Sequence, residues 1–158
     1  MNKINKLYTR REMLALGAGL AAGTLPGIAA AQTSIKPLLA RAIPKSKEML
    51  PVIGLGTAII FDIDSDAEKR AERTQVIRTL LDGGARLIDT APSYGTAEPV
   101  VGDLLAAAKV RDRVFLATKV RSNNNEAFVA QMKQSQQRLH SPKIDLMQMH
   151  NVGFLDRN

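Results

Sequence analysis

The sequence predicts an α/β fold, namely the N-terminal half, about four β/α units, of a (β/α)8 (TIM) barrel. Four short apolar runs alternate with segments whose apolar residues recur at helical spacing, a pattern typical of parallel strands covered by helices. An open doubly wound sheet would share this alternation. The barrel is favoured because one polar residue stands at or just after the end of each run: Thr57, Asp89, Lys119 and His150. In a barrel those strand ends converge on one mouth, where active sites form.

Each predicted element has its own signal in the sequence. PVIGLGTAII at 51–60 combines β-branched residues with glycines and predicts a buried strand ending near Thr57. Ser65 and Glu68 form a capping box that predicts the start of a helix, and Gly83-Gly84 is expected to end it. The apolar face of this helix carries Val76, Ile77, Leu80 and Leu81.

The same pattern repeats along the rest of the chain. ARLIDT at 85–90, RVFLATKV at 113–120 and IDLMQMH at 144–150 predict the other three strands. Thr96 is expected to cap the helix after the second strand, with Pro99 tolerated in its first turn. Apolar residues at helical spacing indicate this helix and the next: Val100, Val101, Leu104 and Leu105 in the first, and Phe128, Val129, Met132 and Leu139 in the second.

The first 50 residues read as an export signal and a linker. Residues 1–31 join a basic start to a Gly- and Ala-rich apolar segment ending in Ala29-Ala30-Ala31. With Arg10-Arg11 before the apolar segment, they resemble a twin-arginine signal peptide, which implies the Tat export machinery as a partner and a periplasmic or otherwise exported protein. Cleavage is expected after Ala31, the alternative being an uncleaved anchor. Glycines and a proline interrupt the segment, so the mature chain is expected to have no stable membrane span. Residues 32–50 are predicted to be a linker.

Composition excludes several classes of function. The net charge is +7, but residues 1–51 hold +6 of it, so the body of the protein is nearly neutral and no nucleic-acid partner is expected. The chain has no cysteine, which excludes disulfides, thiolate catalysis and a cysteine-ligated zinc site. With only two histidines, no metal site is expected.

The four residues Asp89, Tyr94, Lys119 and His150 form a plausible proton-transfer group. A phenol is a poor acid at neutral pH, but a nearby ammonium lowers its pKa, and a carboxylate holds that ammonium in place. The tyrosine can then protonate a developing alkoxide while the histidine orients the carbonyl oxygen. Such a group needs neither metal nor nucleophile, and it suits reduction of a carbonyl by a hydride from a bound cofactor.

Three motifs then identify a family. LIDTAPSYGTAE, FLATKV and KIDLMQMHN, in this order and each ending a strand, resemble the aldo-keto reductase superfamily, with GLGT in place of its first barrel strand. The resemblance covers residues 51–151. It implies that Tyr94 is the proton donor, that Lys119 lowers the pKa of Tyr94, that Asp89 pairs with Lys119, and that His150 orients the substrate carbonyl.

The resemblance also implies the ligands. The family binds NADP(H) or NAD(H) without a Rossmann domain, and its small-molecule substrates are aldehydes, ketones or alcohols. Gly56, Thr57 and Asp89 would lie near the nicotinamide-ribose end of the cofactor, and Asn151 would line the same pocket. No metal is implied.

The chain is expected to be a partial barrel, residues 51–158, because a complete barrel typically needs about 250 residues. The 158-residue chain alone is therefore expected to bind NADPH poorly and to have little activity. Two alternatives to a carbonyl reductase remain: a non-catalytic, cofactor-binding or regulatory barrel protein, and an inert truncated product.

Overall fold

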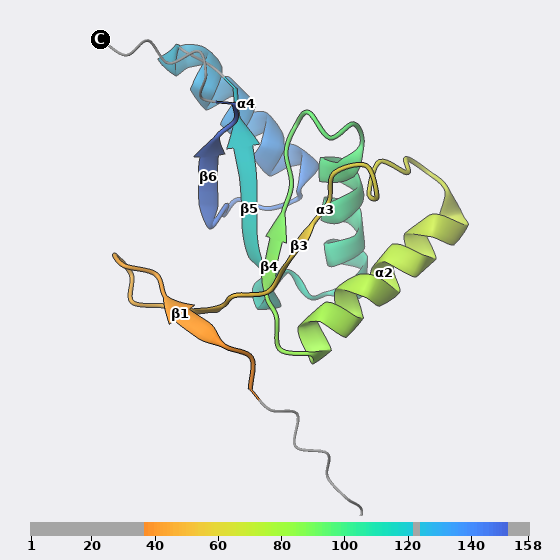
Figure 1. Cartoon of the computed structure of the whole chain (residues 1–158). Helices are drawn as coiled ribbons and strands as arrows, with labels where there is room; N and C mark the ends of the chain where they lie inside the picture. Colours follow the sequence, from red (N-terminus) through yellow and green to blue (C-terminus); the bar gives the residue numbers. More distant parts are fainter. Residues whose placement is uncertain (1–36, 122–123, 152–158) are drawn as a thin grey trace, which may run out of the picture. The chain divides into compact units, whose positions relative to one another are not determined.

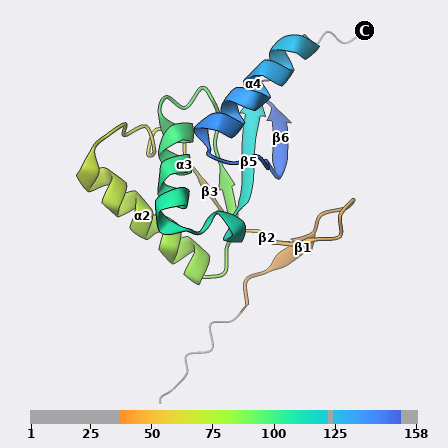
Figure 2. The same ribbon diagram turned by 180° about the vertical axis from the view of Figure 1, so that it is seen from behind.

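A computed structural model describes residues 37–121 and 124–151. The predicted signal peptide, residues 1–31, lies outside these ranges. The α/β prediction is confirmed: a parallel sheet of order β3-β4-β5-β6 has helices α2, α3 and α4 on one face (Figures 1 and 2). In chain order the elements of this unit are β3 (Gly54–Gly56), α2 (Ala67–Asp82), β4 (Leu87–Asp89), α3 (Ala97–Ala108), the 3-10 turn η2 (Arg111–Arg113), β5 (Phe115–Val120), α4 (Asn125–Arg138) and β6 (Leu146–Met149).

The strand register brings the carboxyl ends of the strands together. Gly56 pairs with Asp89, which in turn pairs with Ala117, and Lys119 pairs with Gln148 two positions further along the sheet. Each crossover runs from one strand through a helix to the next parallel strand, as in a β/α barrel. The four-stranded arrangement is that of part of such a barrel.

The hydrophobic core lies between the sheet and the three helices. Helix α3 contributes most to it and is buried along one face from Ala97 to Leu105. Gly102 lets α3 and α4 approach closely, because a Cβ at this position would lie 2.3 Å from the Arg138 carbonyl oxygen. The fully buried members of the core include Phe61, Ile77, Ile88, Val100, Val101, Leu105, Leu116 and Leu139.

The structure departs from the predicted linker at residues 32–50 and from the predicted first strand. Ala40–Ala42 (β1) and Met49–Pro51 (β2) pair as an antiparallel hairpin, so part of the expected linker is regular structure. The apolar run 51–60 is divided: its first residue belongs to the hairpin, Gly54–Gly56 joins the parallel sheet, and Ile59 turns away at φ 65°. The Ile59 side chain is 85% exposed, so the prediction that this apolar run is a buried strand fails at Ile59.

One predicted helix cap was also displaced. Helix α2 begins one residue later than the Ser65–Glu68 capping box indicates, because the Asp66 side chain accepts a hydrogen bond from the Lys69 backbone N–H at 3.0 Å. Thr96 does occupy the N-cap position of α3, but its side chain makes no capping bond to that helix.

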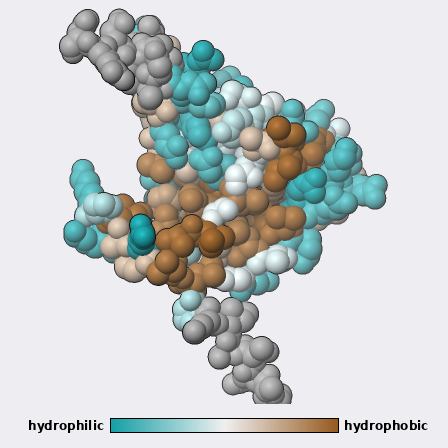
Figure 3. Space-filling model, viewed as in Figure 1, coloured by the Kyte–Doolittle hydropathy of each residue, from teal (hydrophilic) through white to brown (hydrophobic). Residues whose placement is uncertain are grey.

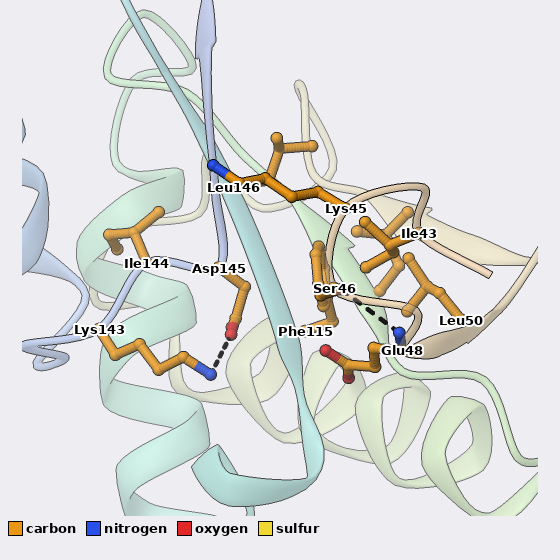
Figure 4. A pocket seen from close by; sticks show the side chains of 11 residues that line it. Ile43, Lys45, Ser46, Glu48, Leu50, Phe115, Lys143, Ile144, Asp145 and Leu146 are labelled. Carbon is orange, nitrogen blue, oxygen red and sulfur yellow. Dashed lines mark hydrogen bonds and ion pairs between the residues drawn. The ribbon is translucent and has the colours of Figure 1, made fainter.

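An apolar cavity of about 730 Å³ lies between the hairpin and the amino ends of β4, β5 and β6 (Figure 4). Leu87, Phe115 and Leu146, the first residues of those strands, line it together with Ile43 and Leu50 of the hairpin segment. Apolar side chains gather over this region in Figure 3. The polar strand ends therefore lie at the other end of the sheet. Over the described ranges, no helix is both long and apolar enough to cross a membrane.

Asp145 joins the start of β5 to the segment that leads into β6. Its carboxylate, 7% exposed, accepts a hydrogen bond from the Leu116 backbone N–H at 2.9 Å and pairs with Lys143 at 2.6 Å and Arg111 at 3.4 Å. Burial alone would raise the pKa of Asp145, but the Leu116 N–H and the two cations together hold it below its ordinary value.

This lowered pKa predicts a pH-dependent contribution to stability. A carboxyl group whose pKa is lower in the folded state stabilises the fold above its unfolded pKa, about 4, and that contribution is lost as the pH falls through the folded value. Asp145→Asn is therefore expected to cost about 1–3 kcal/mol of unfolding free energy at pH 7, and less at pH 3. Urea unfolding at both pH values measures the difference.

Asp82→Asn is the matched control, because Asp82 is 71% exposed in its pair with Arg113 and should contribute less than about 1 kcal/mol. A deficit for Asp145→Asn that is as large at pH 3 as at pH 7 would contradict the assignment.

Candidate active site

The carboxyl end of the sheet brings the four predicted site residues together. Asp89 is the last residue of β4, Lys119 lies next to the end of β5, and His150 follows β6 directly. Tyr94 lies in the loop between β4 and α3. Parallel strands in register place their carboxyl ends on the same edge, which explains how residues 61 positions apart in the chain meet.

Asp89 and Lys119 form the ion pair that the sequence predicts. Lys119 Nζ lies 2.6 Å from Asp89 Oδ2 and also donates to the Thr90 carbonyl oxygen at 2.9 Å. The Lys119 side chain is 12% exposed and the Asp89 side chain is 30% exposed, so both charges are partly removed from water. A short charge-assisted bond with a second acceptor fixes the position of the ammonium.

Tyr94 contacts both Lys119 and His150. Lys119 Nζ lies 4.9 Å from the centroid of the Tyr94 ring, within the range of a cation–π contact. The Tyr94 and His150 rings meet edge to face, with centroids 5.9 Å apart and planes at 88°. The half-buried Tyr94 ring also packs against the core, so this phenol belongs to the site and is not a freely exposed loop side chain.

His150 has a partner that sequence reasoning missed. Its Nδ1 lies 3.2 Å from the Ser93 hydroxyl oxygen, and its backbone N–H donates to the Val120 carbonyl oxygen at 2.8 Å. If the Ser93 hydroxyl donates to Nδ1, the imidazole carries its proton on Nε2, which leaves Nε2–H as a hydrogen-bond donor. Ser93 adjoins Tyr94 in the chain, but nothing in the sequence marks it as a partner of His150.

Gln148 is a second residue that sequence reasoning missed. Its Nε2 lies 3.5 Å from Asp89 Oδ1, on the carboxylate oxygen that Lys119 does not use. Gln148 stands two positions before His150, and alternate residues of a strand share a face. Applying that period to the end of the fourth predicted strand would have found it.

The residues predicted to line the cofactor differ in how well they fit that role. Gly56 is exposed, and a Cβ added there would meet nothing within 4 Å, so the space beside it is open. Thr57, in contrast, is fully buried, and both its N–H and its hydroxyl donate to the Asp89 carbonyl oxygen at 3.1 and 3.0 Å. Thr57 thus holds Asp89 in place. Asn151 is exposed beside His150, at φ 57°.

The donor set of this site is suited to proton transfer and to orienting an oxygen atom. The Tyr94 ring lies beside both the Lys119 ammonium and the His150 imidazole, with a carboxylate beside the ammonium. Within residues 37–121 and 124–151, no group of three or more histidine or acidic side chains is arranged to hold a metal ion.

Comparison with known proteins agrees with this geometry. The model of the Aldo/keto reductase family matches residues 52–156. Aldo-keto reductase YhdN of Bacillus subtilis is 37% identical over 110 residues, which cover 62% of this chain and 33% of that protein. Methylglyoxal reductase YeaE of Escherichia coli is 34% identical over 108 residues, covering 66% and 36%. The chain spans about a third of the length of these curated relatives.

Solved structures that resemble this chain also include aldo-keto reductases. The aldo/keto reductase of Klebsiella pneumoniae in complex with NADP and acetate superposes with a TM-score of 0.58 at 31% identity, covering 66% of this chain and 36% of that one. An aldo-keto reductase of the same organism in complex with NADPH superposes with a TM-score of 0.60 at 29% identity, covering 72% and 40%. With the family model matched over most of the described residues, this chain belongs to the aldo/keto reductase family.

Proposed function

We propose that this protein is an oxidoreductase that transfers a hydride between NADP(H) or NAD(H) and a carbonyl or alcohol substrate, with Tyr94 as the proton donor. The observation that carries the proposal is the contact of the Tyr94 ring with both the Lys119 ammonium and the His150 imidazole at the carboxyl end of the sheet. Relatives solved with NADP and NADPH support the cofactor class.

The residues of this chain fit the part of the reaction that moves a proton. The nicotinamide, when bound, supplies the hydride to the carbonyl carbon. Tyr94 donates its hydroxyl proton to the carbonyl oxygen, on which negative charge develops. The Lys119 ammonium, held by Asp89, stabilises the phenolate that remains. In the proposed step the Ser93 hydroxyl donates to His150 Nδ1, 3.2 Å away, so that Nε2–H donates to the same carbonyl oxygen and orients it.

The substrate class proposed is a small aldehyde or ketone, or the corresponding alcohol in the reverse direction. The names of two relatives, a methylglyoxal reductase and a D-arabinose 1-dehydrogenase, fit this class. Gly56, Asp89 and Asn151 are the residues proposed to line the nicotinamide end of the cofactor, whereas Thr57 would act through Asp89.

A steady-state assay tests the proposal. The assay uses the intact protein, meaning the full-length protein of which the 158-residue chain is proposed to be a part. NADPH or NADH is mixed with it and either methylglyoxal or another small aldehyde, and loss of the reduced cofactor is followed by absorbance. We expect aldehyde-dependent oxidation of the cofactor. Cofactor binding without turnover would instead support a non-catalytic barrel protein, and neither binding nor turnover would support an inert product. We also propose that the 158-residue chain by itself turns over little, since it spans about a third of its relatives.

We further propose export by the twin-arginine route to the periplasm or beyond, supported by Arg10-Arg11 before the apolar segment that ends at Ala31. Replacing both arginines with lysine should retain the protein in the cytoplasm, which cell fractionation would show. Unchanged export of that variant would contradict the proposed route.

A further inference from the structure

The turn that carries Tyr94 is bonded both within its own loop and to a second loop. Within the loop, the Tyr94 N–H donates to the Ala91 carbonyl oxygen and the Ala97 N–H donates to the Tyr94 carbonyl oxygen, each at 3.1 Å. Two residues beyond Tyr94, Thr96 is the N-cap residue of α3, but its own side chain makes no capping bond to the helix. Instead, the Thr96 backbone N–H donates to Asp62 Oδ1 at 2.9 Å, and the Thr96 hydroxyl donates to the same oxygen at 2.8 Å. Asp62 belongs to the loop between β3 and α2, 34 residues earlier in the chain. The start of α3 is thus capped by a different loop.

Gly95 shows how closely the two loops approach. It adopts φ 58°, in the left-handed region, and a Cβ at this position would lie 2.3 Å from the Asp62 carboxylate. Gly95 therefore meets two demands at once: the backbone turn after Tyr94, and room for the carboxylate of Asp62. A side chain at residue 95 would push the acid away from Thr96.

The loop that carries Asp62 is itself anchored. Phe61 is fully buried in the core, and its backbone N–H donates to the Thr57 carbonyl oxygen at 3.2 Å. On the other side of Asp62, the Asp64 backbone N–H donates to the Thr96 hydroxyl oxygen at 3.0 Å. The bonds run in both directions between the loops, so the Asp62 carboxylate is fixed relative to the sheet.

The electrostatics agree with this geometry. The Thr96 backbone N–H, and then its hydroxyl, lower the pKa of the Asp62 carboxyl group below its ordinary value, so Asp62 is ionised at neutral pH. An anion at the N-terminus of a helix is also favoured by the helix dipole.

We propose that Asp62 is a positioning residue for Tyr94: its carboxylate clamps the Gly95-Thr96 backbone and so keeps the phenol against Lys119 and His150. Asp62 acts on the Tyr94 loop through these backbone bonds and is not itself assigned a contact with the reacting atoms. The effect of Asp62 on catalysis rests on the proposed function, whereas its bonds to Thr96 and their effect on the position of Tyr94 do not.

The aromatic composition of the chain allows a direct test. Tyr8 and Tyr94 are the two tyrosines, and there is no tryptophan. In the 158-residue chain carrying Tyr8→Phe, the tyrosine band of the near-ultraviolet circular dichroism therefore reports on the surroundings of Tyr94. Hydrogen exchange at the Thr96 amide, followed by NMR, reports separately on its bond to Asp62.

Three variants are compared in this background. Asp62→Ala is expected to weaken the tyrosine band and to speed exchange at Thr96 by about fivefold or more, the scale of losing a helix cap. Asp62→Asn keeps an acceptor oxygen and should stay within about twofold of the parent. Asp66→Ala is the matched control, because Asp66 is also exposed and caps a helix, but the helix is α2.

The outcomes distinguish failure of the positioning role of Asp62 from failure of the proposed function. In the intact protein, Asp62→Ala should lower kcat for carbonyl reduction about tenfold with little change in cofactor KM, and Asp66→Ala should leave kcat near the parent value. If the parent reduces no carbonyl, the proposed function fails while the circular dichroism and exchange still judge Asp62. An Asp62→Ala variant with the parent's tyrosine band and Thr96 exchange would overturn the proposal. Equal effects of Asp66→Ala, or an Asp62→Asn variant indistinguishable from Asp62→Ala, would also overturn it.

Discussion

Replacing Tyr94 with phenylalanine is expected to lower kcat for carbonyl reduction by about 10²–10⁴-fold, the range typical of a lost general acid. Phenylalanine keeps the ring that meets His150 edge to face and lies beside Lys119, so fold and cofactor affinity should change little. Steady-state kinetics give kcat, and a fluorescence titration with NADPH gives the affinity. The missing hydroxyl is then the only group whose loss accounts for the slower reaction.

Tyr8→Phe, compared in the uncleaved chain, is the matched control for this variant, because it makes the same chemical change outside the proposed site. It should leave kcat unchanged. Turnover of Tyr94→Phe within about twofold of the parent would show that another group donates the proton.

Replacing Lys119 with methionine is expected to lower both turnover and stability. Methionine fills a similar volume but removes the charge that lies 2.6 Å from Asp89 and 4.9 Å from the Tyr94 ring centroid. Asp89 is then left without its cation, and the Thr90 carbonyl oxygen loses its bond to Nζ. We expect a loss of about 1–3 kcal/mol in unfolding free energy and at least about a 100-fold lower kcat.

A second substitution separates these two effects. Adding Asp89→Asn to Lys119→Met removes the uncompensated carboxylate, so the double variant should regain part of the lost stability but none of the lost turnover. Urea unfolding and steady-state kinetics are measured on both variants, with Lys133→Met on the exposed side of α4 as the control. If the double variant recovered turnover together with stability, Lys119 would have a structural role only.

The sequence was sufficient to predict the sheet and its helices, because apolar residues recur at the period of each element. It did not predict the burial of every such residue, since Val76 and Val129 of the predicted apolar faces are 40% and 42% exposed. It also predicted the ion pair of Asp89 and Lys119, since strand ends in a parallel sheet meet regardless of their separation in the chain. The polar residues at those strand ends were the observation that favoured a barrel over an open doubly wound sheet.

The hairpin of β1 and β2 could not be predicted in the same way. Its strands are three residues each, too short for a periodic signal, and its turn places a lysine, Lys47, at φ 62° where glycine or asparagine would have marked it. The apolar run at 51–60 was divided because Pro51 pairs with Ala40 in the hairpin, whereas Gly54–Gly56 pair with β4, and no local pattern encodes these tertiary pairings.

Two residues that sequence reasoning missed, Ser93 in the site and Asp62 beside the Tyr94 loop, act through contacts between distant loops, whereas the strand period could have found Gln148. Ser93 reaches His150 across 57 residues, and Asp62 reaches Thr96 across 34. Exposed serine and aspartate in loops are common, so their residue type carries no signal of its own. Only the fold shows which of them face a functional group.

Transfer of an isotopic label tests the central claim most directly. NADPH carrying two deuterium atoms at the nicotinamide C4 position is incubated with the intact protein and a small aldehyde in ordinary water, and the alcohol is examined by mass spectrometry. We predict one deuterium on the former carbonyl carbon, formed at least about 100-fold more slowly by Tyr94→Phe. An alcohol without deuterium, or equal rates of labelling by the parent and Tyr94→Phe, would contradict hydride transfer with Tyr94 as the proton donor.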